Sequence, residues 1–223
     1  MHREKTMILM LIPVAAASLL AAQSFPLQST EGLTLRNVKA QPDSYKGRKA
    51  VKVTAEDSDN GLAILKGTEF QDGTIEVDLA GEPGPGANSL ARGFVGLAFR
   101  MGPDAAKFEL FYLRPTNGRA EDQERRNHSA QYDSFPDYPW FRLRKENPGK
   151  YESYVDLVPG EWTKVTITVQ GDKARLYVNG SQQPTLIVND LKLGLSKGAI
   201  ALWIGPGTVA HFSNLKVLTA GPR

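Results

Sequence analysis

The sequence predicts an all-β protein built as an antiparallel β-sandwich. Short runs rich in β-branched and aromatic residues recur along the chain, roughly a dozen in number, and Gly, Pro and Asn residues separate them. No segment shows a convincing helical period. The 21 Gly and 14 Pro residues among 223 suit the many turns that such a sandwich needs.

The expected strands follow one another along the chain. They span residues 32–38, 49–56, 62–67, 73–80, 93–101, 107–115, 151–157, 161–170, 173–180, 184–191, 198–205 and 209–218. In the clearest hairpin, Val165, Ile167 and Val169 alternate with polar residues, so that one face belongs to the core. Asn179-Gly180 tolerates the positive φ of a tight turn. The runs "GLAFR" and "GAIALWIG" are apolar throughout, which is typical of inner strands covered on both faces.

The N-terminus has the pattern of a secretory signal peptide, expected over residues 1–22. Arg3 and Lys5 lie in a basic start, an apolar run follows from 7 to 22, and small residues end it near Ala22, the expected cleavage point. This run is shorter than the roughly 20 residues of a membrane span, which disfavours an uncleaved anchor. We therefore expect an exported protein, periplasmic or extracellular, with no membrane span after cleavage. Residues 23–30 are expected as a short linker and 31–220 as one sandwich domain.

Charge and cysteine content narrow the classes of partner. The formal net charge is +3, and removing residues 1–22 lowers it to +2 because Arg3, Lys5 and Glu4 leave. So small a surplus argues against a nucleic-acid partner. The chain has no cysteine, which excludes a disulfide framework and a cysteine-based zinc site. Stability must come from burial and sheet hydrogen bonds, and we expect a monomer.

Four stretches together resemble the concanavalin A-like lectin/glucanase superfamily. They are "FQDGTIEVDLAG", "GFVGLAFR", "GEWTKVTITVQGDKARLYVNG" and "GAIALWIGPGTVAHFSNLKV". The resemblance covers about residues 30–220 and includes the laminin-G-like and the 3-keto-disaccharide-hydrolase-like (DUF1080) secreted bacterial members. It implies a jelly roll of two curved antiparallel sheets whose concave face or rim loops meet carbohydrate. DUF1080 members carry "NSG" before an arginine and a "YEVQ"-like strand, whereas this chain has "GFVGLAFR" and "FELFYLRP".

Three carboxylates in "GTIEVDLAGEPG" raise the question of a glycosidase. Laminarinase-type members of the superfamily carry Glu-x-Asp-x-Glu on a strand, whereas Glu76, Asp78 and Glu82 have a longer spacing. Glu82 would lie roughly 20 Å from Glu76 along an extended strand, far beyond the about 5 to 5.5 Å of a retaining pair. We expect Glu82 in a turn. Glu76 and Asp78 are interpreted as the solvated face of a half-buried strand.

The segment 112–156 is expected as a long polar and aromatic insert that carries the function. Between Arg114 and Lys150 it holds eight Lys or Arg and six Asp or Glu, interleaved with aromatic residues. Flat aromatic faces and side chains with several polar atoms are what sugar recognition needs. Residues of these two types, in the insert and on the strands beside it, are the expected ligand-binding residues: Arg100, Tyr112, Arg114, Asn117, Gln123, Arg126, Asn127, Gln131, Tyr132, Tyr138 and Trp140. The alternative is that these charges pair with one another and the aromatics form the insert's own small core.

His128 is the candidate for acid-base chemistry in the insert. It lies in the sequence near Asp122, Glu124 and Asp133, and imidazole titrates near neutrality. In an enzyme, His128, Glu109 and Asp122 would share the acid-base work. No cofactor is required, although a carboxylate-rich site could hold Ca²⁺, Mg²⁺ or Mn²⁺.

The function expected from the sequence is binding of a carbohydrate or glycoconjugate. One alternative is a glycoside or keto-glycoside hydrolase or lyase of the DUF1080 type. A second alternative is an envelope or adhesion scaffold without a small ligand. Trp162 and Trp203 are interpreted as core residues.

Overall fold

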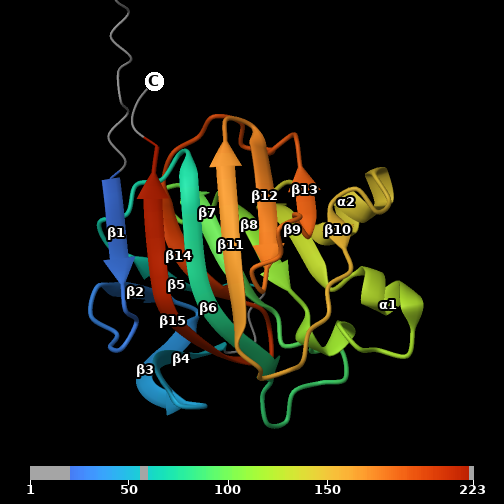
Figure 1. The fold of residues 1–223 in the computed structure, drawn as a ribbon, viewed down its shortest axis with the longest axis horizontal. Coiled ribbons are helices and arrows are strands. Elements are labelled where there is room, and N and C mark those ends of the chain that lie inside the picture. The colour runs from blue at the N-terminus through green and yellow to red at the C-terminus, as the bar shows by residue number, and fades with distance from the viewer. Residues whose placement is uncertain (1–20, 56–59, 221–223) are drawn as a thin grey trace, which may run out of the picture.

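The computed structural model describes residues 21–55 and 60–220. Its strands form two antiparallel sheets, and one sheet packs face to face against the other (Figure 1). This confirms the predicted two-sheet β-sandwich. The helices lie together at one side of the sandwich, beside β9 and β10, as Figure 1 shows.

The first sheet has eight strands, and its longest members are β6 and β15. Its order is β13 (Leu186–Val188), β12 (Lys173–Val178), β11 (Thr163–Gln170), β6 (Gly73–Pro83), β15 (Thr208–Thr219), β4 (Arg48–Ala55) and β3 (Val38–Tyr45), with β1 (Ala21–Phe25) also paired to β15. The β11–β12 hairpin has the expected register, in which Ile167 pairs with Leu176.

The second sheet has seven strands and carries the surface described below as the candidate site. Its order is β10 (Glu152–Ser153), β9 (Ala130–Phe135), β8 (Phe108–Leu113), β7 (Val95–Met101), β14 (Ala199–Ile204), β5 (Gly61–Leu65) and β2 (Leu33–Arg36). Three short helices connect β8 to β9 and β9 to β10, and they are η1 (Pro115–Asn117), α1 (Gln123–Asn127) and α2 (Trp140–Glu146).

The main core fills the space between the sheets because alternate residues of each strand point inward. In β8, Phe111 and Leu113 belong to this core, while Phe108, Leu110 and Tyr112 point to the opposite face. On that outer face of the seven-stranded sheet they join Trp203 and other residues in a second apolar cluster. Both faces of the sheet are thus covered with apolar side chains, as the continuous apolar runs predicted.

Several sequence-based boundaries need correction. Residues 23–30, expected as a linker, begin inside strand β1, whose Phe25 pairs with Leu215 and packs against the core. The segment 112–156 is not a separate insert, because it contains the last residues of β8, the buried strand β9 and the helices. The exposed, polar strand β3 is also absent from the prediction. Local pattern missed β1 and β3 because pairing with neighbouring strands, rather than apolar alternation, holds them in place.

The carboxylates of β6 lie on its solvated face, as interpreted, while Ile75, Val77 and Leu79 are buried. Glu76 pairs with a lysine and Asp78 with an arginine. Glu82, expected in a turn, is instead still on the strand, where it accepts a hydrogen bond from the Tyr45 hydroxyl. The three form no catalytic cluster, because each has its own structural partner.

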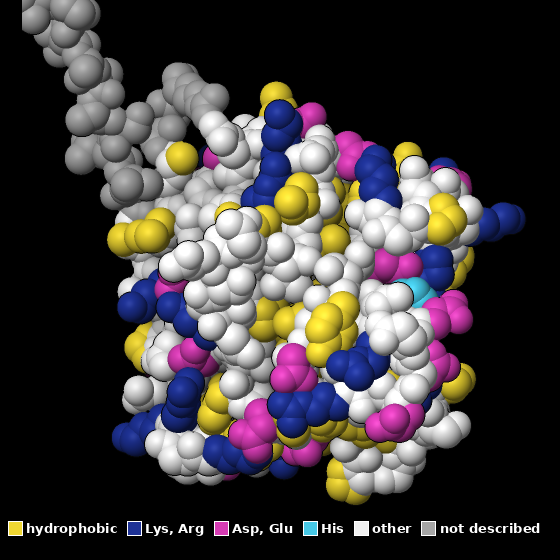
Figure 2. Space-filling model, turned by 45° about the vertical axis from the view of Figure 1, so that its right-hand side comes forward, with side chains coloured by type: hydrophobic (Ala, Val, Ile, Leu, Met, Phe, Trp, Pro, Cys, Tyr) yellow, Lys and Arg dark blue, Asp and Glu magenta, His cyan; other side chains and the backbone are white. Residues whose placement is uncertain are grey.

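Most of the predicted signal peptide, residues 1–20, lies outside the described residues. A cut after Ala22 would leave Gln23, Ser24 and Phe25 paired with β15. Within residues 21–55 and 60–220, no helix is long and apolar enough to cross a membrane. Positive and negative side chains are interspersed over the face shown in Figure 2.

Candidate functional site

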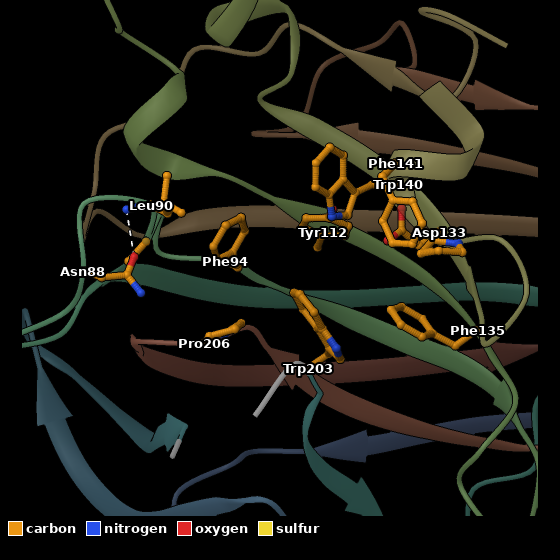
Figure 3. Close-up of a pocket in the computed structure, with 12 residues that line it drawn as sticks. Asn88, Leu90, Phe94, Tyr112, Asp133, Phe135, Trp140, Phe141, Trp203 and Pro206 are labelled. Carbon is orange, nitrogen blue, oxygen red and sulfur yellow. Dashed lines mark hydrogen bonds between the residues drawn. The ribbon is translucent and has the colours of Figure 1, made fainter. Parts of the chain in front are cut away.

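A largely apolar pocket of about 390 Å³ lies on the outer face of the seven-stranded sheet. Its floor consists of Tyr112 from β8, Trp203 from β14 and Phe135 from β9 (Figure 3). The Tyr112 and Trp203 ring centroids are 4.9 Å apart. Strand alternation creates this floor, because the neighbours of Tyr112 in β8 point into the main core. Trp203, interpreted from sequence as a core residue, is indeed buried but also lines the pocket.

The walls of the pocket come from helix α2 and from the loop between β6 and β7. Trp140 and Phe141 begin α2, directly after Pro139, and their rings meet edge to face. They remain 41% and 60% exposed, respectively. Leu90 and Phe94 from the loop lie at the other end of the pocket (Figure 3).

Among the described residues that line the pocket, Asp133 carries the only carboxyl group. The side chain is on β9 and only 2% exposed, and its Oδ1 has no hydrogen-bond partner. Burial raises the pKa of Asp133 well above its ordinary value, although the charge of Arg114 and the backbone N–H of Trp140 act in the opposite direction. The pocket therefore contains a buried carboxyl group with one oxygen, Oδ1, that has no hydrogen-bond partner within the protein.

Arg114 supports the floor of the pocket from the side. Its Nη2 donates to the Tyr112 hydroxyl at 2.7 Å, and its Nη1 donates to Gln131 Oε1 and to the backbone oxygen of His128. Gln131 in turn donates to two backbone oxygens. The Arg114 guanidinium also lies 5.8 Å from the centre of the Trp140 ring. These bonds fix the Tyr112 and Trp140 rings relative to one another.

A second, polar pocket of about 410 Å³ lies beside the first and contains His128. His128 Nε2 is 3.2 Å from Glu152 Oε1, and Arg144 Nη2 is 2.7 Å from Glu152 Oε2. Burial lowers the pKa of His128, and the negative charge of Glu152 offsets only part of this effect. The Arg144 guanidinium lies 4.8 Å from the centre of the Trp140 ring, so that Arg144 and Trp140 together separate the polar pocket from the apolar one.

Three predicted site residues are buried between the sheets and reach neither pocket. The Arg100 guanidinium donates to the backbone oxygens of Gln71, Gly171 and Gly194 and to the Asp72 carboxylate. Glu109 and Tyr132 are hydrogen-bonded to each other at 2.7 Å and are fully buried. Arg100 and Tyr132, predicted to bind a ligand, and Glu109, predicted for acid-base work, thus lie away from both pockets, because their side chains point to the interior and their polar atoms are used within the protein.

The other predicted residues lie mainly around α1. Asp122 caps this helix by accepting from the Arg125 backbone N–H, which occupies the carboxylate proposed for acid-base work. The remaining polar side chains have partners within the protein: Asn117 donates to the His128 backbone, Gln123 to Asn127, and Arg126 to the Tyr154 hydroxyl. Tyr138 lies under the Arg142 guanidinium at 4.4 Å.

The structure thus brings Tyr112 and Trp140 together in the apolar pocket and Asn127 with His128 in the polar one. The sequence pattern does not indicate the apolar lining of the pocket, and it points to Asp133 only as a residue near His128. A strand over 130–135 would have placed Gln131, Asp133 and Phe135 on one face, but the many charges around this segment concealed it.

A metal site formed by clustered side chains is not found in the described part of the chain. No group of three or more His, Cys, Asp or Glu side chains there could hold a metal ion. The divalent cation considered from the sequence stays an untested prediction.

Comparisons with known proteins address the fold and the family. A search of curated proteins finds no match. Among solved structures, the carbohydrate-binding module CBM66 from Bacillus subtilis is similar with a TM-score of 0.58 and 17% identity, over 83% of this chain and 95% of that one. A protein with a galectin-like fold from the same organism has a TM-score of 0.57 and 12% identity, over 92% of this chain and 100% of the other. A candidate glycosyl hydrolase from Parabacteroides distasonis has a TM-score of 0.53 and 14% identity, covering 88% and 99%.

At these identities, the solved structures show a shared sandwich fold. The family follows from the sequence itself, because residues 31–218 match the model of the 3-keto-alpha-glucoside-1,2-lyase-like domain. This match spans nearly all of the residues that form the two sheets, and it confirms the resemblance to the DUF1080 group. The chain belongs to the 3-keto-alpha-glucoside-1,2-lyase-like domain family.

Proposed function

We propose that this protein binds a carbohydrate in the apolar pocket between α2 and the seven-stranded sheet. The observation that carries the proposal is the buried Asp133 carboxyl, whose Oδ1 has no partner and which lies among aromatic rings. Sugar sites combine flat apolar faces with a few well-placed polar groups, because a pyranose ring has an apolar C–H side and hydroxyl groups on its edge. Tyr112, Trp140 and Trp203 supply the faces, and Asp133 supplies the polar group.

The similarity to a carbohydrate-binding module and to a candidate glycosyl hydrolase supports this proposal at the level of the fold. The export proposed next agrees with this function, since a secreted sandwich would meet polysaccharides and glycoconjugates outside the cytoplasm. We propose export on the pattern of residues 1–22, and N-terminal sequencing of the protein secreted by its host tests it. A new N-terminus near Gln23 is expected.

The test of binding is a titration of the protein with a panel of glycosides, followed by tryptophan fluorescence and calorimetry. Two of the three tryptophans, Trp140 and Trp203, line the pocket, so that a bound sugar changes their emission. The third, Trp162, directly precedes β11 of the other sheet, where it lies beside Arg48 and outside the pocket, so it adds a constant background to the emission. The same titration with EDTA present tests the divalent cation. A panel that leaves all emission and heat unchanged would contradict the proposal.

Two substitutions of Asp133 separate binding from chemistry. Asp133→Asn keeps a donor and an acceptor of similar shape, so we expect the affinity to change by less than about fivefold. Asp133→Ala removes both and is expected to weaken binding at least about tenfold, since one hydrogen bond to a buried group contributes roughly 1 to 2 kcal/mol. Thermal unfolding of both variants checks that the fold is retained. Equal affinity of Asp133→Ala and the unaltered protein would exclude Asp133 from the site.

Trp140→Ala tests the stacking role predicted from the sequence. The ring is 41% exposed and stands at the start of α2, so we expect little loss of stability and at least about tenfold weaker binding. Phe→Ala or Trp→Ala changes in a true core would unfold the protein instead, with a cost of roughly 3 to 5 kcal/mol. An unchanged affinity would remove Trp140 from the proposed site.

A second candidate function is a lyase reaction on a 3-keto-glucoside, which the description of the family model suggests. In such a 1,2-elimination the Asp133 carboxylate can take the proton at C2, the C1–C2 double bond forms as the C1–O bond breaks, and the same carboxyl group returns the proton to the departing oxygen. Burial raises the pKa of Asp133, which makes its carboxylate a stronger base for the first transfer. A hydrolase with two carboxylates is less well supported, since the described lining of the pocket contains one carboxyl group.

The lyase candidate makes a distinct prediction for the same variants. With a 3-keto-glucoside, the unaltered protein should release the aglycone and an unsaturated keto sugar, both measurable by chromatography. Asp133→Asn should keep its affinity but lose at least about 100-fold in rate, because an amide can neither take nor return the proton. Binding without any release of aglycone would leave the carbohydrate-binding function and exclude the lyase.

A further inference from the structure

The two ends of the apolar pocket differ in polarity. Asp133 and Trp140 lie at one end, whereas Leu90, Phe94 and Pro206 lie at the other (Figure 3). Tyr112 and Trp203 form the floor between them. A ligand that fills the pocket therefore meets a carboxyl group at one end and apolar side chains at the other.

The apolar end offers little to a second sugar ring. Its one polar side chain is Asn88, whose Oδ1 already accepts from the Leu90 backbone N–H at 2.8 Å. A pyranose carries several hydroxyl groups, and each one buried without a partner costs affinity. The Phe94 ring and Pro206 provide no donor or acceptor side chain for them. This end therefore offers the hydroxyl groups of a second sugar only the Asn88 side chain as a polar partner.

The rim of the same end carries unusually exposed apolar surface. Leu90 is 73% exposed, although it adjoins the aromatic floor of the pocket. On the opposite rim Phe141 is 60% exposed. Apolar side chains gathered around the mouth of a pocket gain when a ligand covers them, because water is then removed from both surfaces.

We propose that the ligand is a glycoside with an apolar, ring-shaped aglycone. The sugar ring lies at the Asp133 and Trp140 end, and the aglycone lies against Leu90, Phe94 and Pro206. The inference rests on the proposed function, and it adds the chemical class of the group attached to the sugar. A glycan of sugars alone fits this pocket less well than an aryl glycoside does.

The experiment compares pairs of ligands that share the sugar and differ in the aglycone. Calorimetry measures the dissociation constants of methyl and 4-nitrophenyl glucosides and galactosides, in both anomers, and of 4-nitrophenol alone. Burial of a ring of this size strengthens binding roughly 10- to 100-fold. We therefore expect the aryl glycoside of the preferred sugar to bind at least about tenfold tighter than its methyl counterpart.

A matched pair of variants locates the aglycone. Leu90→Ala is expected to reduce the aryl advantage by about threefold or more, because one buried methylene contributes roughly a factor of four. Leu195→Ala is the control, since Leu195 is 68% exposed but lies outside the lining of the pocket. Neither change is expected to affect folding, because both side chains are mostly in water.

The outcomes separate the inference from the function on which it rests. Equal affinity of the methyl and aryl glycosides would overturn the aglycone class and leave carbohydrate binding intact. An aryl advantage that survives Leu90→Ala undiminished would overturn the assigned position of the aglycone. Binding of 4-nitrophenol as tight as that of its glycosides, or binding of no ligand in the set, would overturn the proposed function as well.

Discussion

Replacing Tyr132 with Phe tests the assignment of Glu109 and Tyr132 to the interior of the sandwich. The Tyr132 hydroxyl donates to Glu109 Oε2 at 2.7 Å and accepts from the Lys192 backbone N–H at 2.9 Å. The other carboxylate oxygen, Oε1, accepts from the Leu193 backbone N–H at 2.8 Å. Tyr132 therefore links a buried carboxylate of one sheet to the loop that follows β13.

The expected loss of stability follows from the two partners that the substitution leaves unsatisfied. A phenylalanine keeps the ring, which packs against Phe111 with centroids 5.5 Å apart, so that little packing is lost. Each buried polar group without a partner costs about 1 to 3 kcal/mol, which sums to about 2 to 6 kcal/mol for Glu109 and the Lys192 amide. The Ser134 hydroxyl, which has no other partner, can turn toward Glu109 and offset a part. We expect a value near the lower end of this range.

Urea unfolding followed by circular dichroism measures this free energy. Tyr154→Phe is the matched control, because the Tyr154 ring is exposed and its hydroxyl accepts from Arg126, a partner that water can replace. We expect the control to lose less than about 0.5 kcal/mol. A loss below about 1 kcal/mol for Tyr132→Phe, or one equal to that of the control, would refute the structural role of the hydroxyl.

The remaining predictions concern the contacts that hold the loops and α1 to the sandwich. Arg100→Ala should lower the free energy of unfolding by more than about 3 kcal/mol, because it leaves several buried acceptors unpaired. The same change at exposed Arg119 should lower it by less than about 1 kcal/mol. Similar urea midpoints for the two variants would contradict this prediction. At Asp190, burial alone would raise the pKa, but hydrogen bonds from Tyr151, Lys150 and Lys192 lower it from 3.8 to about 2. Asp190→Asn should therefore lower the free energy of unfolding by about 1 kcal/mol at pH 7, after allowance for solvent screening. The difference in stability between the variant and the unaltered protein should vanish as the pH falls from about 4 to 2, because the carboxylate is protonated there. Urea unfolding at several pH values measures this trend, and a constant difference would disprove it. Gly118→Ala should lower the free energy of unfolding by about 1 to 3 kcal/mol, because the added Cβ would lie 2.3 Å from the Leu157 backbone nitrogen. An unchanged melting temperature would show that the loops that hold Gly118 and Leu157 can separate freely.

The sequence alone was sufficient for the fold class and for most of the strands. Alternation in the segment around Ile167 and the continuous apolar run at 199–204 correctly predicted a one-faced hairpin and an inner strand. These patterns are local, because a strand of a sandwich must present apolar residues at every second position to its core. The same reasoning correctly interpreted Glu76 and Asp78 as a solvated face.

The candidate site could be predicted only in part. The aromatic and charged composition of 112–156 indicated a functional region, and Tyr112 and Trp140 do line the pocket. The same composition suggested Arg100 and Tyr132 as ligand-binding residues, although both are buried in the interior. Composition reports which side chains are present, but the face of the strand on which each lies depends on register.

The sequence by itself determined a two-sheet sandwich, an N-terminal export pattern and membership of the family. Only the tertiary structure decided that Asp133, Tyr112 and Trp203 form one site, since β14, which carries Trp203, is far along the chain from β8 and β9, which carry Tyr112 and Asp133. Helix α2 lies over that floor, where its Leu143 is buried in the main core and the Arg114 and Arg144 guanidinium groups lie over the Trp140 ring. The physical reason is that sheet pairing and burial are long-range interactions, which bring together residues that no local pattern relates and which leave Oδ1 of the buried Asp133 carboxyl without a partner.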